Sequence, residues 1–151
     1  MLLIKHIPAE VCQNLEGVFF DIDDTITTDS CLGGAAYFAI ERLKQAGLVT
    51  VPITGRPAGW CDMIARFWPV DGVVGENGAF YFAYDRSAAK MHRRYIRTQE
   101  QRFEDQTKLA TLKKEILQKV PGSAISADQA YREADLAIDF CEDVSPLTQE
   151  A

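Results

Sequence analysis

The segment VFFDIDDTIT at residues 18–27 decides the fold class, because an apolar, β-prone run leads directly into three carboxylates and a threonine. Residues 17–22 are predicted to form a buried strand, and unpaired carboxylates at such a strand are costly unless a cation neutralises them. Side chains of extended backbone repeat with period two, so Asp21 and Asp23 are predicted to lie side by side over one site. Carboxylate oxygens favour a hard cation such as Mg²⁺. An acidic capping turn is the alternative interpretation, although capping does not require three carboxylates.

The rest of the first half predicts an alternation of strands and helices. Helices are predicted over 33–46 and 57–67, and strands over 48–53 and 71–74. This β-α-β-α-β order implies right-handed crossovers and a parallel sheet, and therefore an α/β fold. The buried side of the second helix is predicted to consist of Met63, Ile64 and Phe67, and the tryptophans at 60 and 68 are interpreted as packing residues.

The second half has a different pattern. Residues 79–84 and 93–97 are predicted to be antiparallel strands, and residues 136–140 a further strand. Thr98 and Gln101 form a capping box that starts a helix running to about residue 120. Its apolar residues lie on roughly one face: Phe103, Leu109, Leu112, Ile116 and Val120. The change of pattern predicts a core at 1–82 and a second unit at 83–151.

Polar residues follow each strand of the predicted parallel sheet. Thr54-Gly55-Arg56-Pro57 comes after the second strand, and Glu76-Asn77-Gly78 comes after the third. Ligands of parallel α/β sheets bind beyond the carboxyl ends of the strands, so these residues are expected to converge with Asp21 and Asp23. A hydroxyl and a glycine amide at a helix N-terminus are suited to hold a phosphoryl oxygen.

The motifs DIDDT, TGRP and ENGA, in this order, resemble the Cof-type, sugar-phosphatase-like branch of the haloacid dehalogenase superfamily. The resemblance implies a Rossmann-like core, an α+β cap inserted after the third strand, and phosphatase chemistry through an aspartyl-phosphate intermediate. Asp21 is then the nucleophile and Asp23 the general acid and base. The resemblance also implies that the Asp21 carboxylate and the Asp23 backbone carbonyl would hold Mg²⁺.

The resemblance also implies which residues bind the substrate. Thr54 would be the phosphate ligand, Gly55 and Arg56 match the usual continuation of its motif, and Asn77 matches the segment that leads into the cap. The substrate would be a small phosphorylated metabolite, and the cap would close over its leaving group. The helix over 98–120 would then contribute to specificity.

Two motifs of the superfamily are missing. These are a Lys or Arg that balances charge at the phosphoryl group, and a downstream acidic pair that completes the Mg²⁺ shell; no Lys or Arg follows Arg132. The sequence therefore predicts an incomplete core, truncated within the cap, with weak or no phosphatase activity by itself. Exposed apolar surface would favour homo-oligomers or strand exchange.

A compact, capless enzyme is the alternative. In that enzyme Asp139 or Glu142-Asp143 would be the acidic pair, and the helix would supply the lysine: Lys113, Lys114 or Lys119.

Composition excludes some classes of protein. The 151 residues are 47% hydrophobic and carry a net charge of −6, which argues against a general nucleic-acid binder. Residues 86–119 have ten Lys/Arg against four Asp/Glu, which indicates either a solvated helix or an electropositive lid. No signal peptide and no run of about 20 apolar residues is present, so a cytoplasmic protein with reduced cysteines and no membrane partner is expected.

Two other functions stay open at this point. One is a non-catalytic module that keeps the phosphate-site geometry for binding or assembly. The other is a phosphotransferase or mutase, which shares the aspartyl-phosphate intermediate. Replacing Asp21 with Asn would separate an enzyme from a binding module, because only the enzyme needs the nucleophile.

Overall fold

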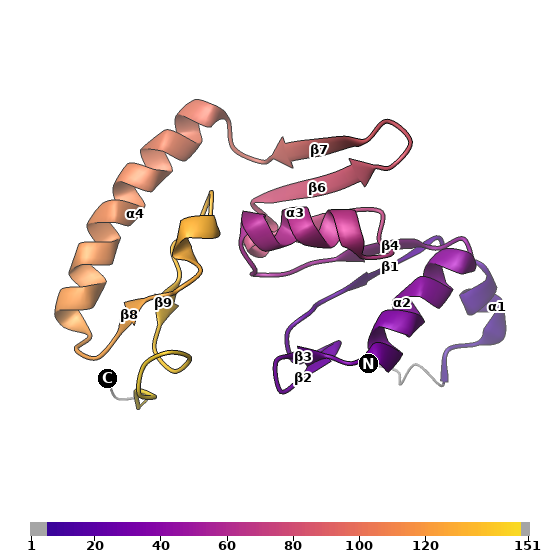
Figure 1. Ribbon diagram of the computed structural model, residues 1–151, viewed down its shortest axis with the longest axis horizontal. Coiled ribbons are helices and arrows are strands. Elements are labelled where there is room, and N and C mark those ends of the chain that lie inside the picture. The colour runs from indigo at the N-terminus through magenta and orange to yellow at the C-terminus, as the bar shows by residue number, and fades with distance from the viewer. Residues whose placement is uncertain (1–5, 149–151) are drawn as a thin grey trace.

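The computed structural model describes residues 6–148 (Figure 1). The first half contains α1 (Ala9–Gln13), β1 (Gly17–Phe20), β2 (Thr27–Thr28), β3 (Cys31–Leu32), α2 (Gly34–Gln45), β4 (Val49–Pro52), α3 (Ala58–Phe67) and β5 (Val73–Gly75). The second half contains the 3-10 turn η2 (Glu76–Gly78), β6 (Phe80–Asp85), β7 (Lys90–Tyr95), α4 (Gln99–Lys119), β8 (Ala124–Ile125), the 3-10 turn η3 (Gln129–Tyr131) and β9 (Ile138–Asp139). This mixed α/β architecture confirms the predicted fold class.

A parallel sheet forms the centre of the core. β1 and β4 run parallel, with Phe20 opposite Pro52, and a parallel bridge between Ile53 and Val74 continues the sheet to β5. The crossovers carry α2, which contacts β4, and α3, which contacts β5 and β6. Figure 1 shows α3 lying across the strands. The β-α-β-α-β interpretation is therefore confirmed.

The buried core lies between α3 and the hairpin that extends the sheet. β5, β6 and β7 are antiparallel, and the rings of Phe80 and Phe82 stack with their centroids 4.4 Å apart. Both side chains are fully buried, and each contributes about 1.5–3 kcal/mol of transfer free energy. The predicted domain boundary at 82/83 falls inside β6, which pairs with β7 on both sides of the boundary and with β5 before it. The division into core and cap stays a prediction.

The buried face of α3 differs from the prediction. Ile64 is buried as expected, but Met63 is 42% exposed and Phe67 is 72% exposed. Smaller residues face the sheet instead: Ala58, Cys61, Ile64 and Ala65. The helix lies close to the sheet because Gly75 has no Cβ, and a Cβ there would come within 2.6 Å of the Cys61 sulfur. Trp60 of the same helix is interpreted from the sequence as a packing residue, but it is 43% exposed.

Helix α4 forms as predicted but packs little. The capping box is complete, because the Thr98 side chain accepts from the Gln101 amide and the Gln101 side chain accepts from the Thr98 amide. No residue of α4 is buried, and Phe103 remains 72% exposed. None of the helices within residues 6–148 has the length and apolar character that a membrane crossing requires.

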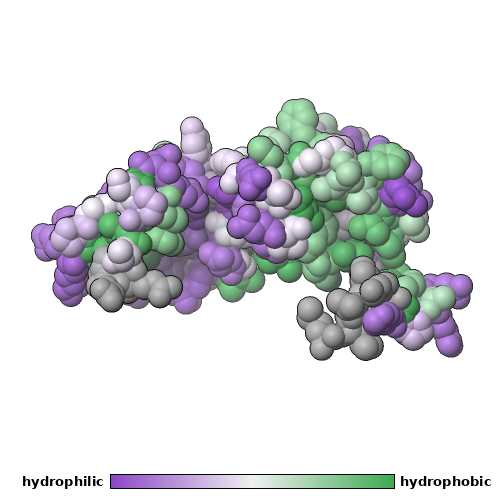
Figure 2. Space-filling view, turned by 90° about the horizontal axis from the view of Figure 1, so that it is seen from below, coloured by the Kyte–Doolittle hydropathy of each residue, from purple (hydrophilic) through white to green (hydrophobic). Residues whose placement is uncertain are grey.

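Hydrophobic side chains remain at the surface of the core. Figure 2 shows them gathered on the right of the view, over the core, while polar side chains dominate on the left. Within residues 6–148 β1 pairs with β4 alone, which leaves its other edge unpaired. Phe19 on this edge strand is 67% exposed, and Phe38 of α2 and Val49 of β4 are also exposed.

Candidate active site

The carboxylate of Asp21 lies directly beyond the end of β1. Its Oδ2 atom accepts a hydrogen bond of 3.0 Å from the hydroxyl of Thr25. A second hydroxyl fixes the turn between them, since Thr27 Oγ1 accepts from the Asp24 amide and donates to the Ile22 carbonyl. The threonines after the acidic cluster therefore hold the nucleophile candidate in place and leave its second oxygen for an incoming group.

The ends of three strands meet around Asp21, as the parallel topology predicted. A cleft of about 420 Å³, called here the Asp21 cleft, is lined by Asp21, Thr54, Gly55, Asn77 and the apolar side chains of Phe19, Phe20 and Ile53. These residues come from the ends of β1, β4 and β5. The structure thus brings together four of the six predicted site residues.

The turn after β4 is held tightly against the turn after β5. Thr54 is buried, its amide donates to the Val74 carbonyl at 2.9 Å, and its hydroxyl accepts from the Arg56 amide. Asn77 has left-handed backbone (φ 56°), and its amide donates to the Thr54 carbonyl. The Asn77 side chain lies over Gly55, where a Cβ would come within 3.1 Å of its Oδ1 atom. Gly55 therefore allows Asn77 to approach the cleft.

Asp23 and Arg56 do not line the Asp21 cleft. Arg56 contacts Asp23 through Nη2 at 2.6 Å and through Nε at 3.1 Å to both carboxylate oxygens. The hydrogen bond to Asp23 raises the pKa of Arg56. The guanidinium also lies over the ring of Trp60, 4.8 Å from its centroid. The extended backbone ends at Ile22, whose carbonyl accepts from the amides of three later residues, so the period-two expectation for Asp23 no longer applies.

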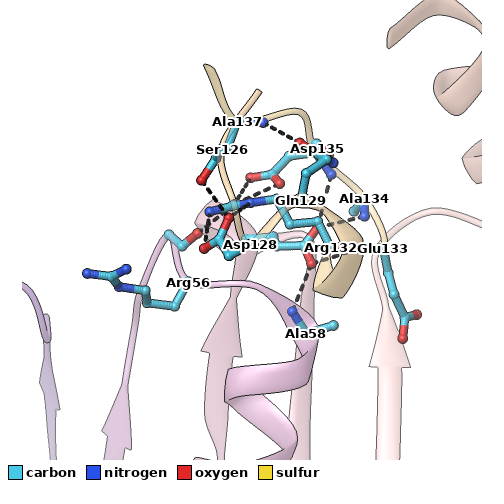
Figure 3. A network of polar contacts seen from close by, with 12 residues as sticks. Arg56, Ala58, Ser126, Asp128, Gln129, Arg132, Glu133, Ala134, Asp135 and Ala137 are labelled. Carbon is cyan, nitrogen blue, oxygen red and sulfur yellow. Dashed lines mark hydrogen bonds and ion pairs between the residues drawn. The ribbon is translucent and has the colours of Figure 1, made fainter. Parts of the chain in front are cut away.

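Glu76 is a site residue that the sequence did not reveal as important. It is 3% exposed, and its carboxylate accepts four backbone hydrogen bonds (Figure 3). The donors are the amides of Ala58 (3.0 Å), Glu133 (2.9 Å), Ala134 (2.6 Å) and Asp135 (2.9 Å). A carboxylate in a turn is an ordinary sequence feature, and no local signal connects it to partners that follow 57 to 59 positions later. Charge-assisted hydrogen bonds of this kind are about twice as strong as neutral ones.

Arg132 joins the same network from the distal segment. Its Nη1 atom donates to the Gly55 carbonyl at 2.9 Å, and the guanidinium also pairs with Asp128 and Asp135. Burial opposes the charge of this side chain, but the hydrogen bonds to Asp128 and Asp135 raise the pKa of Arg132. Figure 3 shows Arg56 pointing away from this network. All three carbonyls of residues 54–56 therefore accept a hydrogen bond. The Asn77 amide donates to Thr54, the Arg132 guanidinium to Gly55 and the Glu76 amide to Arg56.

The metal ligands predicted from the sequence are few. Across residues 6–148, no group of three or more His, Cys, Asp or Glu side chains is placed to hold a metal ion. The Asp21 carboxylate and the Asp23 carbonyl are hard oxygen donors, and Mg²⁺ in proteins is often held by one or two carboxylates with water and substrate phosphate. The donor set therefore fits Mg²⁺ in chemical type.

The alternative acidic ligand, Asp139, already has a structural role. It is buried, and its carboxylate accepts from the amides of Cys141, Glu142 and Asp143. These backbone hydrogen bonds, led by that of Glu142, lower the pKa of Asp139.

The chain matches no protein-family model, and no curated protein matches it. Solved structures do match. A Thermoplasma acidophilum protein aligns with 83% of this chain at a TM-score of 0.59 and 16% identity. A haloacid dehalogenase-like hydrolase from Bacteroides thetaiotaomicron aligns with 77% of this chain at a TM-score of 0.51 and 15% identity. A haloacid dehalogenase-like hydrolase from B. subtilis aligns with 74% of this chain at a TM-score of 0.50 and 13% identity.

The chain has a haloacid dehalogenase-like fold. Within this fold the Asp21 cleft lies at the carboxyl ends of the parallel strands, where ligands of α/β sheets bind. The chain spans 51%, 42% and 36% of the lengths of these three solved chains. The resemblance drawn from DIDDT, TGRP and ENGA is therefore confirmed at the level of the fold.

Proposed function

We propose that this chain carries the nucleophile half of a Mg²⁺-dependent phosphatase that acts on a small phosphorylated metabolite. The observation that carries the proposal is the Asp21 cleft, in which a carboxylate, a threonine, a glycine turn and an asparagine meet at three strand ends. A carboxylate held by the Thr25 hydroxyl beside a strand-to-helix turn suits attack on a bound phosphoryl group. The motifs support the Cof-type branch, with residues 83–151 as part of a cap.

The reaction would proceed in two displacements. The free carboxylate oxygen of Asp21 attacks phosphorus, the bond from phosphorus to the leaving oxygen breaks, and Asp23 donates a proton to that oxygen. Asp23 then takes a proton from water, whose oxygen attacks phosphorus. The bond from phosphorus to Asp21 breaks, inorganic phosphate leaves, and both carboxylates return to their starting states. Splitting the hydrolysis in this way replaces one slow step by two faster ones.

Mg²⁺, held by the Asp21 carboxylate and the Asp23 carbonyl, would reduce the repulsion between Asp21 and the phosphate dianion. The turn at 54–56 would orient the phosphoryl oxygens through the Thr54 hydroxyl and the Gly55 amide. Asn77 would contribute its amide from the opposite wall.

The ion pair between Arg56 and Asp23 has a mechanistic consequence. Asp23 cannot donate a proton to the leaving oxygen while its carboxylate accepts three contacts from Arg56. The phosphate dianion offers Arg56 a competing partner of higher charge. We therefore assign to substrate binding the role of drawing Arg56 away from Asp23.

The nucleophile can be tested with beryllofluoride, which forms a carboxylate adduct that mimics an aspartyl phosphate. We expect the 151-residue chain with Mg²⁺ to give a bound ¹⁹F NMR signal, and Asp21→Asn to abolish it. Asp24→Asn is the matched control, because Asp24 belongs to the same acidic cluster but lines neither the Asp21 cleft nor the cavity on the Asp23 side. A signal that survives in Asp21→Asn would contradict the proposal.

A second candidate is a non-catalytic phosphate-binding or assembly module. Two observations favour it: Asp23 is engaged by Arg56, and within residues 6–148 no group of three or more His, Cys, Asp or Glu side chains is placed to hold a metal ion. Such a module would bind inorganic phosphate in the Asp21 cleft without forming the adduct. A phosphotransferase or mutase would form the adduct but pass the phosphoryl group to an organic acceptor, which product analysis detects.

A further inference from the structure

A second cavity lies next to the Asp21 cleft and holds both tryptophans of the chain. This cavity of about 550 Å³, called here the tryptophan hollow, has apolar walls made by Ile22, Leu32, Trp60, Met63, Ile64 and Trp68. The walls come from the β2–β3 hairpin and the residues before it, from α3 and its C-terminal end, and from Cys141 and Glu142 after β9. The volume lies within the range of about 300–1,000 Å³ that small-molecule sites occupy.

Two loops connect this hollow to the Asp21 cleft. Asp21 lines the cleft, and Asp23, two residues further on, lines the hollow; Gly55 lines the cleft, and Arg56, the next residue, lines the hollow. The carboxylate proposed to protonate the leaving oxygen therefore belongs to the wall of the hollow. A phosphomonoester whose phosphorus lies at Asp21 would direct its leaving group past Asp23 and into this space.

The hollow offers apolar surface to a ligand beside the polar side chains of Thr27 and Ser30. Trp60 is 43% exposed and Met63 42% exposed, so both offer contact area to a ligand. One interaction already restrains the Trp60 ring, because the Arg56 guanidinium lies over it at 4.8 Å while it pairs with Asp23. Aromatic and thioether surfaces favour aromatic and aliphatic partners.

Charge in the hollow argues against a second anionic group on the ligand. Its charged wall residues are Asp23, Glu142 and Arg56, whose formal charges add up to −1. Arg56, the positively charged residue, is paired with Asp23. A carboxylate or a second phosphate would meet Glu142 without a free cation in this wall.

We infer that the tryptophan hollow receives the leaving group, and that the preferred substrates are phosphomonoesters of aryl or largely apolar alcohols without a second anionic group. The inference rests on the proposed function. It differs from the expectation that α4 sets specificity. One cavity on α4 is lined by residues of that helix alone, another by α4 and residues 129–136, and neither includes a residue of the Asp21 cleft.

Binding experiments with the 151-residue chain and Mg²⁺ test this inference. Inorganic phosphate, methyl phosphate and phenyl phosphate are titrated, with calorimetry for affinity and tryptophan emission as a direct report on the hollow. We expect phenyl phosphate to bind about tenfold more tightly than methyl phosphate and to shift the emission further than methyl phosphate or inorganic phosphate does. Trp60→Ala and, independently, Met63→Ser should each reduce this preference to about threefold or less. Phe103→Ala removes an exposed aromatic side chain from α4 and should leave the preference unchanged.

The outcomes separate the two proposals. Equal affinities for phenyl and methyl phosphate, or a preference that survives both hollow variants, would overturn the inference while leaving phosphate binding at Asp21 intact. If inorganic phosphate fails to bind and beryllofluoride forms no adduct, the proposed function is wrong. If phenol shifts the tryptophan emission and no phosphate binds, the leaving-group role is also overturned. The hollow would then bind an apolar molecule independently of the Asp21 cleft.

Discussion

Arg132 donates a hydrogen bond of 2.9 Å from Nη1 to the backbone carbonyl of Gly55, across 77 positions of sequence. The same guanidinium pairs with Asp128 and Asp135, and its side chain is 9% exposed. Arg132 therefore ties the segment before β9 to the turn that forms one wall of the Asp21 cleft. The segment that the resemblance assigns to the cap thus supports the phosphate-binding turn directly.

Replacing Arg132 should destabilise the protein and loosen that turn. Arg132→Ala removes the guanidinium partner of Asp128, Asp135 and the Gly55 carbonyl, which we expect to cost about 3 kcal/mol of unfolding free energy. Arg132→Lys should cost less but lose the forked geometry. Urea unfolding measures both. Lys108→Ala on exposed α4 is the control, and equal effects of Arg132→Ala and Lys108→Ala would contradict the prediction.

Glu76 should be more sensitive than any exposed carboxylate. Glu76→Ala removes the acceptor of four backbone amides, and we expect a loss of about 3 kcal/mol or more in unfolding free energy. Glu76→Gln should also destabilise, because one of its two acceptor positions becomes a donor that faces amide donors. Thermal unfolding compares both with Glu104→Ala on α4. A Gln variant as stable as the native protein would show that the carboxylate is not needed.

Acid should weaken the structure partly through Asp139. Backbone hydrogen bonds, led by that of Glu142, lower the pKa of Asp139 in the folded state, so folding favours its ionised form. The resulting stability is present above the unfolded pKa of about 4 and is lost as the pH falls through the lower folded value. Asp139→Asn should therefore destabilise the protein at pH 7 and progressively less below pH 4. Urea unfolding at pH 7 and pH 3 measures this difference, with exposed Asp29→Asn as the control. A cost that does not depend on pH would refute this role for the charge.

The four cysteines should differ sharply in reactivity. Cys61 is fully buried, and desolvation raises the pKa of its thiol to about 12, whereas Cys12, Cys31 and Cys141 are exposed. Because the thiolate is the reactive form, iodoacetamide should modify three cysteines in the folded protein and the fourth only in urea. Peptide mass spectrometry identifies the modified sites. Rapid labelling of Cys61 without denaturant would mean that α3 opens readily.

Within the described residues one edge of β1 has no partner strand, and this edge should promote self-association. Phe19 is 67% exposed on this strand, whose other edge pairs with β4. Exposed apolar strands pair with other chains unless a charge prevents it, so Phe19→Lys should lower the average mass in sedimentation equilibrium. Phe103→Lys is the matched control, since Phe103 is exposed to a similar degree on α4. If both variants sediment like the native chain, β1 is not the contact.

Sequence alone predicted the parallel strands with their helices, the later hairpin, α4 and the convergence of the strand ends, but not α1, β2, β3 or β8. Apolar runs and capping residues are local signals, and they predicted the parallel strands, the later hairpin and the Thr98 cap correctly. Once the sheet is parallel, the carboxyl ends of its strands must meet at one edge. For that reason the order of the motifs was enough to group Asp21, Thr54, Gly55 and Asn77 into one cleft.

Tertiary structure alone decided how the remaining groups pair. The turn that begins at Ile22 directs Asp23 toward Arg56, and the close approach at Gly75 selects which residues of α3 are buried and leaves Trp60 exposed. The bonds of Glu76 and Arg132 join residues 57–77 positions apart. Such contacts arise from the geometry of chain packing, and no local pattern encodes them, because each partner alone reads as an ordinary polar surface residue.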